Sequence, residues 1–153
     1  MGTRQLTTAL LDRSLAGLDW MVRLRGAPKL PQHLLTGLSG EDAALFELRR
    51  KGYTIVARRW SAGNISGDLD LIAWQGELLC FIEVKTRTAH DMTPAEAAVD
   101  GHKQYVLRRL ARAYLRQLPQ AEAPQARFDV MSVYLVKGEK REILHFENAF
   151  GWN

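Results

Sequence analysis

The chain has 153 residues, a length typical of one globular domain and too short for two. Hydrophobic residues make up 46% of the sequence, and no apolar run approaches the roughly 20 residues that a membrane-spanning helix needs. The start of the chain lacks the continuous apolar core of a signal peptide, and a single cysteine, Cys80, excludes an internal disulfide. These observations predict a soluble cytoplasmic protein with no membrane partner.

Charge is distributed unevenly, although the formal net charge is only +4. Residues 61–100 carry 2 basic and 7 acidic side chains, whereas residues 101–118 carry 5 basic and no acidic ones. An acidic centre beside a basic segment suits a polyanion that basic side chains hold while carboxylates face it through bound cations. A basic helix with simply solvated charges is the alternative.

In chain order, residues 1–36 read as an N-terminal extension and linker. A helical pattern around residues 10–24 is followed by the prolines and glycines of RGAPKLPQHLLTG, which interrupt regular structure.

The first clear helix is predicted over residues 40–51, with Ser39 as its N-cap and Gly52 as its C-terminal stop. Glu41 shares a stripe with Ala44, at the i, i+3 spacing of a helix face that packs inward. Its carboxylate either points into a site or stabilises the helix dipole at the N-terminal turn.

Three strands are predicted next. YTIVARRW (53–60) is rich in β-branched and aromatic residues, and the loop 61–67 separates it from LDLIAW and ELLCFIEVKT. The latter two flank Gln75 and Gly76 and therefore predict a hairpin. The second hairpin strand is apolar on both faces, as in the middle of a sheet covered on both sides.

A second helical segment is predicted from the capping-box pattern at Thr93–Glu96 to about Leu118, with a break near Gly101. RFDVMSVYLV then reads as a strand, KGEK as a turn and EILHF as a closing strand. The order α-β-β-β-α-β(β) predicts an α/β fold in which helices flank a central mixed sheet.

The stretch FIEVKT places Glu83 and Lys85 on one face of a strand, because side chains alternate. A hairpin loop of two or four residues pairs Asp70 with position 81 or with position 83, and either register turns Asp70 toward Glu83. An odd-length loop without a bulge sends Asp70 to the opposite face.

Two neighbouring carboxylates in a half-buried site repel each other unless a cation lies between them. Mg²⁺ prefers such oxygen ligands, and Lys85 beside it could hold a water and stabilise charge on a phosphate. The trio therefore fits metal-dependent phosphodiester hydrolysis. An ordinary ion pair at a strand end is the alternative for Glu83 and Lys85.

Several longer stretches together resemble one known family. They are SGEDAALFELRRKGYTIVARRW, GDLDLIAWQGELLCFIEVKTR, AVDGHKQYVLRRLARAYL, RFDVMSVYL and HFENAF. These stretches resemble the YraN-like family of small bacterial proteins, a branch of the restriction-endonuclease-like superfamily that is similar to archaeal Holliday-junction resolvases. The resemblance covers roughly residues 37–150.

The resemblance implies a restriction-endonuclease-like core over residues 37–153, with Mg²⁺ or Mn²⁺ as cofactor and DNA as substrate, branched or damaged DNA included. Asp70 and Glu83 correspond to the metal-binding acids and Lys85 to the catalytic lysine. Glu41 matches an additional acid of the resolvase-like branch. Val84 would offer its backbone carbonyl to the metal.

The second helix supplies the expected contacts to nucleic acid. Lys103 corresponds to the lysine at the head of the family's second helix, and a buried stem with its head in solvent is the alternative. The predicted phosphate contacts are Arg108, Arg109, Arg112 and Arg116. A homodimer is a further expectation from the resolvases. Two other functions stay open: a catalytically inactive nucleic-acid-binding module, and an adaptor that docks a partner through residues 1–36.

Overall fold

The computed structural model describes residues 31–90, 99–119 and 123–153. The chain divides into two units, Met1–Leu35 and Thr36–Asn153, and the second contains all the described strands. Most of the predicted extension, including its helical pattern at residues 10–24, and the capping box at 93–96 lie outside the described residues.

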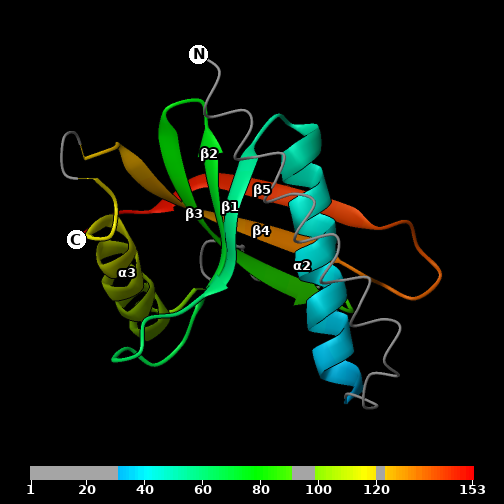
Figure 1. Cartoon of the computed structure of the whole chain (residues 1–153). Helices are drawn as coiled ribbons and strands as arrows, with labels where there is room; N and C mark the ends of the chain where they lie inside the picture. The colour runs from blue at the N-terminus through cyan, green and yellow to red at the C-terminus, as the bar shows by residue number, and fades with distance from the viewer. Residues whose placement is uncertain (1–30, 91–98, 120–122) are drawn as a thin grey trace, which may run out of the picture. The chain divides into compact units, whose positions relative to one another are not determined.

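A five-stranded mixed sheet of order β1-β2-β3-β4-β5 forms the centre of the second unit (Figure 1). The strands are β1 (Thr54–Trp60), β2 (Leu69–Gln75), β3 (Leu78–Arg87), β4 (Ala126–Tyr134) and β5 (Glu142–Phe150). All neighbours are antiparallel except β3 and β4, which are parallel and are joined through helix α3 (Gly101–Leu115). The expected α/β class, mixed sheet and element order are confirmed.

Each face of the sheet has its own hydrophobic core. On the α3 face, α3 residues such as Leu107 and Leu110 pack with Phe81 and Phe128. On the α2 face, helix α2 (Gln32–Arg50) packs with a separate group of strand side chains that includes Ile82. Because both faces are covered, β3 is apolar on both sides, as expected for a central strand. None of the described helices combines the length and apolarity that a membrane span requires.

Helix α2 begins at Gln32, so the predicted start at residue 40 is wrong. Ser39 therefore does not cap it, and Glu41 lies mid-helix, where the dipole at the N-terminal turn does not reach. The helix contains Gly40 because a Cβ at that position would lie 1.8 Å from Oγ1 of Thr86 on β3. Close packing between helix and strand, which composition does not reveal, overrides glycine's low helix propensity.

Helix α3 begins where the break near Gly101 was predicted. The side chain of Asp100 accepts a hydrogen bond from the backbone N–H of Lys103 at 2.8 Å, which is the N-cap interaction. Strand β5 runs to Phe150, beyond the predicted EILHF. A bulge near Asn148 interrupts the alternation of its side chains, so the sequence pattern does not reveal the last residues of the strand. The backbone of Asn148 is left-handed, with φ of 53°, a conformation that asparagine tolerates.

Candidate active site

The hairpin of β2 and β3 sets the positions of the two expected metal-binding acids. Gln75 pairs with Leu78 across a two-residue turn, and Leu71 pairs with Ile82. One step further along this register, Asp70 stands opposite Glu83. The even-length alternative is therefore the observed one, and both carboxylates lie on the α3 face of the sheet.

Glu83 is a buried carboxylate between two lysines. Its residue is only 4% exposed. The Nζ atom of Lys85 lies 3.0 Å from Glu83 Oε1, and the Nζ atom of Lys103 on α3 lies 3.3 Å from Oε2. In the described part of the chain, Glu83 Oε2 has no hydrogen-bond partner. Lys103 was expected to contact substrate phosphate, and the structure places its ammonium inside the acidic site, next to Glu83.

Asp70 shares this environment, and its pKa shows that the site disfavours a second negative charge. Burial is the main cause that raises the pKa of Asp70 from 3.8 to about 7, and the charges of Glu83 and Glu41 raise it further. The backbone N–H of Val84, 2.7 Å from Oδ2, and the charge of Lys103 oppose the rise. A second carboxylate in this site therefore ionises only at a cost that a bound cation would remove.

Glu41 is near Asp70, but its carboxylate is already engaged. The Nε atom of Arg59 lies 2.7 Å from Glu41 Oε2, and that of Arg58 lies 3.6 Å from the same oxygen. Arg59 has a left-handed backbone with φ of 48°, a strained conformation for a residue with a side chain. The structure thus places Glu41 at the edge of the site, where a metal would have to compete with Arg59 for it.

The donor set fits a hard divalent cation, although no complete cage is preformed. In the described ranges, no three acidic, histidine or cysteine side chains are close enough to hold an ion by themselves. Mg²⁺ usually takes only one or two carboxylates from a protein and fills its other positions with water and substrate oxygens. Asp70 and Glu83 supply that number, and Glu83 Oε2 is a buried acceptor whose contact with the Lys103 ammonium, at 3.3 Å, is an ion pair without hydrogen-bond geometry. A role for the Val84 carbonyl stays a prediction.

The arginines of α3 divide into two pairs. Arg108 donates to the backbone carbonyl of Gly151 at 2.8 Å, and Arg112 donates to that of Trp152 at 3.0 Å. Both guanidinium groups therefore hold the C-terminal segment against the helix, a use that the sequence did not predict. Arg109 on the same helix and Arg116 at its C-cap are exposed and remain the better candidates for phosphate contacts.

Comparison with known proteins assigns the chain to a family. The model of the Uncharacterised protein family UPF0102 matches residues 40–133. The chain belongs to this family. A UPF0102 protein of Koribacter versatilis is 52% identical over 95% of this chain and 93% of its own length. A UPF0102 protein of Solibacter usitatus is 43% identical over 71% of this chain and 81% of its own length. One of Porphyromonas gingivalis is 38% identical over 79% of this chain and 87% of its own length.

The UPF0102 match confirms that the chain belongs to a family of bacterial proteins, as expected from its sequence motifs. The matched segment contains the whole hairpin and α3, and with them Asp70, Glu83, Lys85 and Lys103. Strand β5 and the C-terminal segment held by Arg108 and Arg112 lie outside it. The charged cluster is therefore located in the part of this UPF0102 chain that the family shares.

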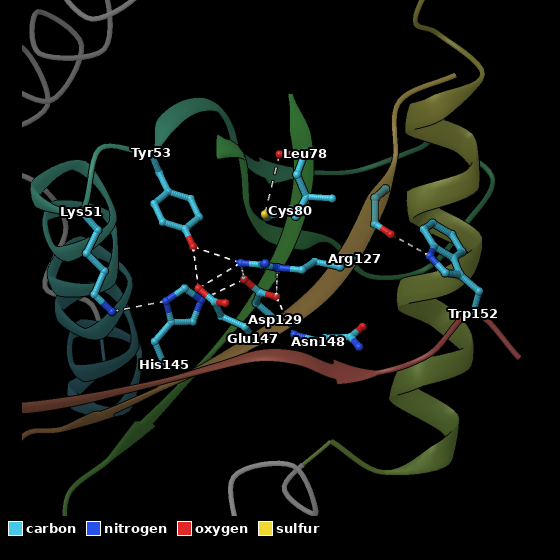
Figure 2. A network of polar contacts seen from close by, with 11 residues as sticks. Lys51, Tyr53, Leu78, Cys80, Arg127, Asp129, His145, Glu147, Asn148 and Trp152 are labelled. Carbon is cyan, nitrogen blue, oxygen red and sulfur yellow. Dashed lines mark hydrogen bonds and ion pairs between the residues drawn. The ribbon is translucent and has the colours of Figure 1, made fainter. Parts of the chain in front are cut away.

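A second polar cluster lies on the α2 face, and sequence reasoning missed it (Figure 2). Asp129, fully buried on β4, accepts from the Arg127 guanidinium at 2.8 Å and from the Asn148 backbone N–H at 2.9 Å. His145 Nε2 lies 2.9 Å from the other Asp129 oxygen. Arg127 and His145 hold the pKa of Asp129 below its usual range, despite burial. This cluster anchors the β5 bulge.

The histidines form no metal-ligand spacing in the sequence, and the structure places a ring nitrogen of His145 and one of His90 within hydrogen-bond distance of a carboxylate. His145 is buried against Asp129, whereas His90 is exposed and lies 2.7 Å from Glu139. The only sequence signal for the cluster is the alternation of RFDV, which turns Arg127 and Asp129 to the same side.

Proposed function

We propose that this UPF0102 protein is an endonuclease that uses Mg²⁺ or Mn²⁺ to hydrolyse phosphodiester bonds in DNA, with branched or damaged DNA as candidate substrates. The observation that carries the proposal is the burial of Glu83 beside Asp70 on one face of the sheet, with two lysine ammonium groups directed at it. The wider placement in the restriction-endonuclease-like superfamily belongs to the same proposal.

Asp70 and Glu83 would hold the ion, which supplies Lewis-acid polarisation of the phosphate and a nucleophile at neutral pH when bound. Lys85 is 30% exposed at its side chain and so reaches from the buried carboxylate to the entrance of the site. There its ammonium can orient a water and stabilise negative charge that develops on a phosphate oxygen. Lys103 adds a second positive charge at the same point.

The exposed arginines of α3 suit the rest of the substrate. Arg109 lies on α3 and Arg116 at its C-cap, and this helix carries Lys103 in its first turn and no acidic side chain. Phosphate contacts along this helix would position a strand with one phosphodiester at the acids. A homodimer would present two such sites to a symmetrical branched substrate, and sedimentation of the pure protein tests that expectation.

The second candidate is a nucleic-acid-binding module that keeps this fold without turnover. The observation that favours it is the pairing of Glu83 with Lys85 and Lys103, which compensates the buried charge without a metal. Under this reading, binding to DNA weakens steeply with salt but is insensitive to EDTA and to Asp70→Asn.

A nicking assay separates the two. Wild type, Glu83→Gln, Lys85→Ala and the control Glu77→Gln, in the exposed hairpin turn, are incubated with supercoiled plasmid and with a four-way junction, in Mg²⁺, Mn²⁺ or EDTA. We expect metal-dependent cleavage by wild type and by the control, and a loss of roughly 100-fold or more in the two site variants. Equal residual cleavage by wild type and Glu83→Gln would identify a contaminant and overturn the enzyme proposal.

A further inference from the structure

Ser132 on β4 is a buried hydroxyl with no assigned role. Its residue is fully buried, and its Oγ atom has no hydrogen-bond partner in the described part of the chain. Burying a hydroxyl without a partner is unfavourable, so such groups are rare in native proteins and call for an explanation.

The register of the sheet places Ser132 beside the candidate active site. In the parallel pairing of β3 with β4, Lys85 stands directly opposite Ser132. Alternation from the α3-face residues Phe128 and Val130 turns Ser132 to the same face as Glu83 and Lys85. The unsatisfied hydroxyl is therefore the strand neighbour of the lysine that pairs with Glu83.

Binding of a divalent cation at Asp70 and Glu83 changes what Lys85 can contact. Its ammonium lies 3.0 Å from Glu83 Oε1 in this structure, and a cation that takes this oxygen would also repel the ammonium. A lysine has a flexible stem and three donors, so it can turn to another nearby acceptor. Ser132 offers one that is already desolvated and unused.

We propose that Ser132 is a positioning residue that accepts the Lys85 ammonium when Glu83 binds a divalent cation. This inference rests on the proposed function. Ser132 keeps Lys85 at the entrance of the site, pointing at substrate, instead of letting it drift into solvent. The Lys85 ammonium is the partner proposed for this hydroxyl, because the register sets the two residues opposite each other.

The proposal makes opposite predictions for the two states. Without divalent cation, Ser132→Ala removes a group that has no partner, so the melting temperature should stay the same or rise. With the cation bound, the variant loses a hydrogen bond to a charged group, and the dissociation constant for Mg²⁺ should rise about tenfold. Ser132→Cys, which is similar in size but a poor acceptor, should behave like Ser132→Ala.

Isothermal titration calorimetry of the full chain with MgCl₂ tests this with wild type, both Ser132 variants, Lys85→Met and the Lys85→Met/Ser132→Ala double variant. The exposed control is Ser66→Ala. If Ser132 acts through Lys85, its substitution has no effect on Mg²⁺ affinity in the Lys85→Met background, because the two effects couple completely.

The outcomes separate the inference from the function it builds on. An unchanged Mg²⁺ affinity in Ser132→Ala, or an equal loss with and without Lys85, overturns the role of Ser132 but leaves the metal site intact. A lower melting temperature of Ser132→Ala without Mg²⁺ also overturns it, since the hydroxyl would then have a partner already. No Mg²⁺ binding by wild type removes the metal site and this inference together.

Discussion

Replacing Asp70 by asparagine should stabilise the protein at pH 8 and abolish its response to Mg²⁺. The carboxyl is half-buried, and its pKa is raised from 3.8 to about 7 by burial and by the charge of Glu83. An asparagine side chain has nearly the same shape and can still accept the hydrogen bond of the Val84 N–H. It carries no charge, so it removes the cost of ionisation.

The stabilisation by Asp70→Asn depends on pH because the folded and unfolded chains bind the Asp70 proton with different affinities. The folded protein holds the Asp70 proton more tightly, so the penalty is absent below pH 4, grows between pH 4 and pH 7, and is complete above pH 7. Three pKa units correspond to roughly 4 kcal/mol. Because the side chain keeps some contact with water, we expect about 2 kcal/mol of stabilisation at pH 8 and none near pH 4.

Urea unfolding of wild type and Asp70→Asn at both pH values measures this difference, and groups common to both proteins cancel. A melting experiment with added Mg²⁺ at pH 8 gives the functional half: wild type and the Glu77→Gln control should be stabilised and Asp70→Asn should not. If Asp70→Asn is no more stable than wild type at pH 8, or if the difference in stability is the same at both pH values, the argument from buried charge is refuted.

Three further predictions concern other parts of the molecule. Gly40→Ala should lower the free energy of unfolding by about 2 kcal/mol or more, because the added Cβ overpacks against β3. Gly37→Ala should raise it by about 0.5–1 kcal/mol, because a Cβ there meets no atom within 4 Å and alanine favours the helix. Urea unfolding curves measure both changes. Asp129→Asn should cost about 3 kcal/mol by breaking a buried ion pair, with an unchanged Mg²⁺ affinity in calorimetry; an altered affinity would show that the two faces are coupled. Arg109→Ala should weaken DNA binding and reduce its salt dependence by about one ion, and Arg112→Ala should mainly lower the melting temperature; the reverse assignment would contradict the division of the arginines.

Local signals account for most of what the sequence predicted correctly. The hairpin follows from two β-rich runs around Gly76, and its even-length turn brings Asp70 to Glu83. Lys103 was expected at the head of the second helix, and the structure places it there, against Glu83. The hydrophobic pattern predicts the strands, whereas the register follows from the observed two-residue turn, because the sequence left an odd-length loop open.

The features that were missed depend on contacts between distant segments. Gly37 belonged to the predicted linker, yet it lies inside α2, and the close contact with Thr86 that explains a glycine at position 40 involves a distant strand. Arg108 looked like a phosphate contact, but its Nε–H donates to the carbonyl of Gly151 and its NH2 group to the side chain of Gln104. The partners of Asp129 come from β5 and from its own strand, and no spacing in the sequence joins them in advance.

The single parallel pairing in the sheet has a consequence for how the protein folds. A two-residue turn joins β2 to β3, so Asp70 and Glu83 can meet within the time in which a hairpin forms. Lys103 and Ser132 arrive only after the chain has closed the long crossover through α3, which is the slower step. The nascent hairpin therefore brings the two acids together with only its own lysine, Lys85, beside them, before Lys103 on α3 adds the second positive charge.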